Sequence, residues 1–164
     1  MNTEFITEIE GYRGRMRVLV RSIVGDDALA QDIVQDSVLA YLQAVSGGAE
    51  IVSPGAWLMR VARNRALDSV RSVGFSRASV LESAWRHDSG VDVEKDLNMR
   101  ERVGQVYSVV RQLPEQQRSV FILRDVLGYE MEEISDITGC GTDNVRQMLS
   151  RARKRIREYL MKNE

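Results

Sequence analysis

The chain has 164 residues, of which 43% are hydrophobic and 29% charged, and its formal net charge is −1. This composition is ordinary for one folded domain or two small ones, and no apolar run approaches the roughly 20 residues that a membrane span needs. The acidic N-terminus predicts no secretory leader, and one Cys with one His predicts neither a disulfide nor a metal site, so we expect a cytoplasmic protein without a cofactor.

Hydrophobic spacing predicts three helices in the first part of the chain. Apolar residues recur at steps of three and four over residues 5–23 and again over residues 30–45. The Gly-Asp-Asp segment at 25–27 separates these helices, since glycine ends a helix and aspartate caps the next one. A third helix is expected from Pro54 to about Val73, because proline suits the first position of a helix.

The rest of the chain predicts a linker and a second group of helices. Residues 74–98 lack sustained periodicity and read as a linker, whereas helical spacing returns over residues 99–113 and 115–127, with Gly128 as a C-cap. We therefore predict an all-α fold of two small helical domains joined by a linker. The expected boundaries are 1–73 for the N-terminal domain, 74–98 for the linker and 99–164 for the C-terminal domain.

The last segment predicts a helix-turn-helix. Residues 130–139 read as a short helix with Ile134 and Ile137 facing inward, and the glycines on either side of Cys140 make a tight turn. A second helix, capped by Gly141 or Thr142, then buries apolar residues at steps of four and three. In such a motif the first helix crosses the DNA backbone and the second enters the major groove.

The exposed face of that second helix carries polar and then basic side chains. Side chains of these kinds donate hydrogen bonds to base edges and to phosphates. The alternative is a plain helical hairpin with a solvated basic face. We predict DNA contacts from Thr142, Asp143, Asn144, Arg146, Gln147, Ser150, Arg151 and Arg153.

Charge is segregated along the sequence although the total is near zero. Residues 125–143 contain six acids and no base, and residues 146–157 contain six bases and no acid. Residues 24–45 contain four Asp and no base, whereas residues 54–77 contain five Arg and one Asp. Such segregation predicts surfaces with different partners, the alternative being solvated helix faces.

Two N-terminal helix faces fit this segregation. Asp32, Gln35 and Asp36 fall within one turn of the second helix, on a face without bases that suits a basic partner. On the third helix, Arg60 and Arg63 lie close to a glycine-containing loop, and a basic helix beside such a loop suits single-stranded DNA.

Together these segments resemble small bacterial sigma factors of the extracytoplasmic-function group, in the sigma-70 superfamily. Residues 32–38 resemble the family's core-polymerase-binding helix, usually written D-I-V-Q-E-x-F. Trp57-Leu58, followed by Arg60, Ala62, Asn64, Asp68 and Arg71, resembles its promoter-melting and minus-10-reading helix. Residues 113–121 and 150–153 resemble its minus-35-reading domain.

The resemblance implies a transcription initiation factor that binds core RNA polymerase and reads two promoter elements. Asp32, Gln35 and Asp36 would contact the clamp helices of the polymerase's largest subunit, and residues 142–153 would read minus-35 double-stranded DNA. The loop 46–53 would engage the melted minus-10 strand together with Arg60, Arg63, Asn64 and Arg71. A cognate anti-sigma partner is also implied, and catalysis is not.

The chain departs from the family pattern at Ser37-Val38, which stands near a common Phe, and at two residues of the C-terminal domain. Glu130 stands at the N-cap of the first helix of the motif, where Ser or Thr is common and a better cap. Met148 stands where a basic residue is frequent, so we expect an apolar contact in place of a phosphate contact.

Two other classes of protein remain as alternatives. A dimeric helix-turn-helix regulator with an N-terminal sensing domain would bind a palindromic site without polymerase. An enzyme would have to use Asn64, Asp68 and His87, but no nucleophile with a base and no phosphate-binding glycine loop accompanies them.

Overall fold

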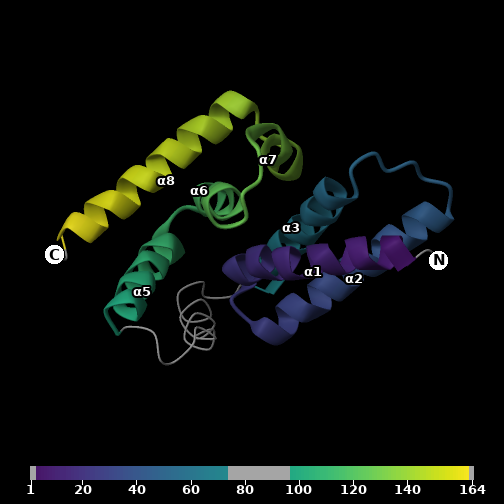
Figure 1. Cartoon of the computed structure of the whole chain (residues 1–164), viewed down its shortest axis with the longest axis horizontal. Coiled ribbons are helices and arrows are strands. Elements are labelled where there is room, and N and C mark those ends of the chain that lie inside the picture. Colours follow the sequence, from purple (N-terminus) through teal and green to yellow (C-terminus); the bar gives the residue numbers. More distant parts are fainter. Residues whose placement is uncertain (1–2, 74–96, 163–164) are drawn as a thin grey trace.

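The computed structural model of the protein describes residues 3–73 and 97–162, and within these ranges every regular element is helical (Figure 1). The expected all-α class is therefore confirmed. Residues 74–96, which make up most of the predicted linker and include His87, lie outside the described residues.

The N-terminal domain consists of α1 (Thr3–Val24), α2 (Asp27–Ser46) and α3 (Pro54–Val73), and each of these helices packs against the other two. Gly25 has a φ of 76°, which ends α1. The Asp26 carboxylate then accepts hydrogen bonds from the backbone N–H groups of Ala28 and Leu29, at 2.9 and 3.3 Å, and caps α2. These boundaries match the sequence prediction because glycine and a capping carboxylate act locally.

The C-terminal domain consists of α5 (Leu97–Gln112), α6 (Glu115–Phe121), the π-helical turn η1 (Ile122–Val126), α7 (Met131–Thr138) and α8 (Thr142–Lys162). The long helix α8 packs against α5, α6 and α7. Its buried side chains share a core with apolar residues of the other elements, including Val120, Leu123 and Ile134.

The structure corrects the expected uninterrupted helix over residues 115–127. After Phe121 the backbone widens into η1, where the Leu127 N–H donates to the Ile122 carbonyl, five residues earlier, at 2.9 Å. The Tyr129 N–H then reaches back to the Leu123 carbonyl at 2.9 Å. The π geometry keeps both Ile122 and Leu123 buried while it turns the chain toward α7.

The two domains contact each other. Helix α3 packs against α7 and α1 packs against α6, as Figure 1 shows. We call this contact, together with the turn at residues 127–129 that borders it, the seam. It brings the predicted minus-10-reading helix against the first helix of the predicted helix-turn-helix.

Candidate nucleic-acid interface

Helices α7 and α8 form the predicted helix-turn-helix. Gly139 has a φ of 76°, a left-handed conformation that suits glycine, and its N–H donates to the Ser135 carbonyl at 2.9 Å. The Ser135 hydroxyl donates to the Cys140 carbonyl and closes the turn. The expected apolar residues face inward on both helices, and all are buried: Ile134, Ile137, Val145, Leu149, Ala152 and Ile156.

The outer face of α8 presents the predicted DNA-reading side chains to solvent. Thr142 is half-buried, and the other seven are exposed: Asp143, Asn144, Arg146, Gln147, Ser150, Arg151 and Arg153. Along this helix the basic residues follow the acidic one, so the face becomes cationic after its first turn. The geometry therefore provides a helix that can enter a major groove with polar and basic groups forward. DNA contacts from these residues remain a prediction.

Two of the arginines on α8 have acidic neighbours. Arg146 Nη1 lies 3.1 Å from Asp143 Oδ1, one turn earlier on the same helix. Arg153 binds Asp125 of η1 with both ends of its fork, at 2.6 and 2.8 Å. The hydrogen bond to Asp125 raises the pKa of Arg153 above its ordinary value.

Contacts within the C-terminal domain account for the unusual residues Glu130 and Met148. The Glu133 carboxylate accepts a hydrogen bond from the Glu130 N–H at 3.0 Å, so α7 begins with a capped N-terminus despite the unusual residue. Met148 is only 5% exposed, and its side chain belongs to the core. The expectation that Met148 makes an apolar contact with DNA is therefore wrong in this structure.

The predicted polymerase-binding residues lie together on the surface of α2. Asp32, Gln35 and Asp36 are exposed, whereas the opposite face of the helix is buried against the other two helices. Leu39 follows one turn later and is 48% exposed, so this face carries an apolar side chain beside its acidic ones. Leu39 was not predicted as part of this surface, although its spacing from Gln35 and Asp36 places it on the same face.

The predicted minus-10 residues on α3 do not all share one surface. Arg60, Asn64 and Arg71 are exposed. Arg63 is only 4% exposed, because it falls on the helix face that carries the buried Met59 and Ala66. Its Nη2 lies 2.8 Å from Glu115 Oε1, and its Nε donates to the Ser119 hydroxyl at 3.3 Å. In this arrangement Arg63 faces α6 instead of solvent.

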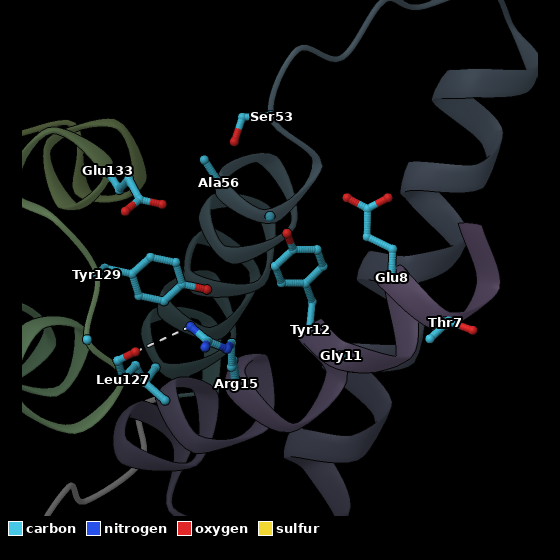
Figure 2. Close-up of a pocket in the computed structure, with 12 residues that line it drawn as sticks. Thr7, Glu8, Gly11, Tyr12, Arg15, Ser53, Ala56, Leu127, Tyr129 and Glu133 are labelled. Carbon is cyan, nitrogen blue, oxygen red and sulfur yellow. Dashed lines mark hydrogen bonds between the residues drawn. The ribbon is translucent and has the colours of Figure 1, made fainter. Parts of the chain in front are cut away.

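A hollow of about 470 Å³ borders the seam between α1, the start of α3 and the turn at residues 127–129 (Figure 2). Arg15 spans it: its Nη1 donates to the Leu127 carbonyl at 3.3 Å, and its guanidinium carbon lies 5.2 Å from the ring centroid of Tyr129. The Tyr129 hydroxyl is buried, and burial raises its pKa, although the neighbouring Arg15 partly offsets this rise. The hollow thus marks a second polar contact between the domains.

Comparison with known proteins finds two segments of one family. Residues 9–75 match the family described as Sigma-70 region 2, and residues 104–156 match Sigma-70, region 4. The first segment holds most of α1 and all of α2 and α3, and the second holds the helix-turn-helix. The chain belongs to the sigma-70 family.

Curated proteins similar to this sigma-70 family member are named as sigma factors of the extracytoplasmic-function (ECF) group. In Mycobacterium tuberculosis, ECF RNA polymerase sigma factor SigG is 27% identical over 93% of this chain and 48% of its own length. ECF RNA polymerase sigma factor SigJ is 28% identical over 92% of this chain and 49% of its own length. The chain spans about half the length of these relatives.

A solved structure shares the fold. The sigma factor RpoE from Bartonella quintana, in complex with the anti-sigma factor NepR, matches with a TM-score of 0.73 and 22% identity over 98% of both chains. Within the described residues, no helix is long and apolar enough to cross a membrane, and no group of three or more His, Cys, Asp or Glu side chains is placed to hold a metal ion.

Proposed function

We propose that this chain is a transcription initiation factor that binds core RNA polymerase and directs it to promoters. The observation that carries the proposal is that helix α8 exposes its cationic outer face to solvent and buries its inner face in the helix-turn-helix core. The region 2 match on the other domain supports a second promoter contact from the same chain.

Each exposed surface has a role in this proposal. The outer face of α8, from Thr142 to Arg153, reads the minus-35 duplex. Helix α3 and the loop 46–53 hold the melted minus-10 strand, through Arg60, Asn64, Arg71 and, once it is exposed, Arg63. The acidic face of α2 docks on polymerase through Asp32, Gln35 and Asp36.

The proposal extends to regulation and location. The sigma factor RpoE that shares the fold was solved with an anti-sigma factor, which supports a similar partner for this chain. A factor that assembles with polymerase works in the cytoplasm, and the chain itself carries out no catalysis. The free chain should bind promoters weakly, because each domain buries little area on DNA and polymerase supplies the spacing between them.

Binding to purified core polymerase tests the proposal, with a fluorescent label on the full chain. The wild type should bind with a dissociation constant below 1 µM, on the order of −8 kcal/mol. The double variant Asp32→Ala/Asp36→Ala should bind at least tenfold more weakly, whereas Glu132→Ala, which removes an exposed acid from α7, should bind like the wild type. Equal binding by the acidic-face variant would contradict the assigned docking face.

The same labelled protein also distinguishes the initiation factor from the alternative function, a dimeric helix-turn-helix regulator. A helix-turn-helix regulator would be a dimer in solution, would bind a palindromic duplex tightly without polymerase, and would show no affinity for the core enzyme. A monomer that binds core polymerase favours the initiation factor.

A further inference from the structure

Arg63 differs from its neighbours on α3 in having a partner across the seam. Arg60, Arg65 and Arg71 are exposed, but the side chain of Arg63 is 5% exposed and that of its partner Glu115 is 14% exposed. The Ser119 hydroxyl completes the cluster, since it donates to Glu115 Oε1 at 2.7 Å and accepts from Arg63 Nε at 3.3 Å. One residue of the N-terminal domain and two of the C-terminal domain are therefore hydrogen-bonded to one another.

The chemistry of this cluster makes two partners of Arg63 mutually exclusive. A guanidinium binds a carboxylate and a phosphate through the same fork of N–H donors. While Glu115 holds Nη2, these donors are not available to a DNA backbone. Because desolvation offsets much of the attraction in a buried ion pair, such a pair can be exchanged for another anion at little net cost.

The dimensions of a promoter require the seam to open. The two elements named minus-35 and minus-10 lie about 25 base pairs apart, or about 85 Å at about 3.4 Å per base pair. A compact chain of 164 residues has a radius of gyration of about 15 Å and thus a diameter of about 40 Å. With the seam closed, α8 and α3 cannot both reach their elements on one promoter.

We propose that Arg63, Glu115 and Ser119 form a latch, which closes the seam in the free chain and withholds Arg63 from the minus-10 strand. The strand binds Arg63 only after the domains separate. The latch rests on the proposed function for the identity of the DNA strand. Its closing of the seam is a property of the free chain and is measured without polymerase.

Arg15 offers an independent way to weaken the seam. It bridges the domains at the hollow through the Leu127 carbonyl and the Tyr129 ring (Figure 2). Among the described residues, no hydrogen bond or ion pair links Arg15 to Arg63 or Glu115. Arg15→Ala removes a positive charge, whereas Glu115→Gln removes a negative one. An effect shared by both variants therefore comes from opening the seam and not from a change in net charge.

Labelling with phenylglyoxal, which modifies accessible guanidinium groups, tests the latch on the full chain, with the modified residues identified by mass spectrometry. In the wild type Arg63 should react slowly and the exposed Arg65 quickly. We expect the rate at Arg63 to rise at least fivefold in Glu115→Gln and in Arg15→Ala, with the rate at Arg65 unchanged. Glu132→Gln, which removes an exposed acid of α7, should leave both rates as in the wild type.

A second arm tests the competition with DNA. A random-sequence pool of single-stranded 20-nucleotide DNA should slow the labelling of Arg63 at least threefold in Glu115→Gln, whereas duplexes of the same length should not. Unchanged labelling of Arg63 in both seam variants overturns the latch, and so does labelling that single strands do not slow. Circular dichroism checks that each variant is folded, and Ser119→Ala replaces Glu115→Gln if the latter unfolds. Failure to bind polymerase would overturn the proposed function while leaving a closed seam intact.

Discussion

Arg146 and Arg153 share the outer face of α8 but have different surroundings. Arg146 lies one turn into the helix, where recognition helices contact base edges. Among the described residues, the only acidic side chain that it binds is Asp143, which is fully exposed. Arg153 lies two turns further on and is held by Asp125 of η1, which fixes its guanidinium near the rim of the motif. We therefore expect Arg146 to contact base edges and Arg153 to contact the DNA backbone through its Nη1, which does not bind Asp125.

Alanine variants separate these two roles. Arg146→Ala should cost about 1–3 kcal/mol on the preferred duplex and much less on point variants of it, because a bidentate base contact is lost. Arg153→Ala should weaken all duplexes by a similar factor and lower the slope of log K against log salt by about one. Fluorescence anisotropy at several salt concentrations measures both.

Lys154→Ala serves as the control for this pair, since Lys154 is exposed on α8 but lies outside the predicted DNA-reading set. It should change neither specificity nor the salt slope by a comparable amount. Identical behaviour of Arg146→Ala and Arg153→Ala would contradict the separate assignments.

The surroundings of single residues on α3 could be predicted from the sequence only in part. The sequence spacing that puts Asn64 and Arg71 on one side of the helix with Trp57 indicated a half-buried polar cluster, but both residues are exposed, as is Arg60. Burial of Arg63 does not follow from the sequence either, because its partner Glu115 is 52 residues away and belongs to another domain. A buried ion pair between distant segments leaves no local pattern, so only the folded chain reveals it.

At the scale of elements, local signals are sufficient wherever a cap or a turn decides the boundary. Asp26, Pro54 and Gly139 begin or end helices as the sequence predicts. The π-helical turn η1 was not predictable, since a shift from four-residue to five-residue hydrogen bonds leaves the apolar spacing almost unchanged. The cap at Glu130 was not predicted, because it depends on a reciprocal pairing with Glu133, three residues later.

The turn between α7 and α8 should be sensitive to substitution at Gly139. Its φ of 76° is costly for a residue with a Cβ atom, so Gly139→Ala should lower the free energy of unfolding by about 1–2 kcal/mol. Gly104→Ala is the matched control: this glycine lies within α5, where an added Cβ meets nothing within 4 Å, and the change should stabilise the protein by up to about 1 kcal/mol. Urea unfolding followed by circular dichroism measures both, and equal stability of the two variants would refute the left-handed turn.

At the scale of the whole molecule, the near-neutral net charge conceals three surfaces. The acidic face of α2 and the cationic face of α8 are both exposed, while part of the basic helix α3 is covered by the seam. The segregation of charge predicted separate partners, but the closed arrangement includes polar contacts between the domains, such as Arg63 with Glu115, that the sequence does not specify. On the proposed function, two DNA-binding sites held too close together in the free chain would make promoter recognition depend on polymerase.

Transcription reconstituted from purified parts tests this account most directly. Core polymerase, the full chain and a library of genomic promoter fragments are combined, and the 5′ ends of the transcripts are mapped. The account predicts that the chain adds starts at defined positions that core polymerase alone does not use, and that Arg146→Ala and Asp32→Ala/Asp36→Ala abolish most of them while Lys154→Ala does not. Start sites that are the same with and without the chain would contradict it.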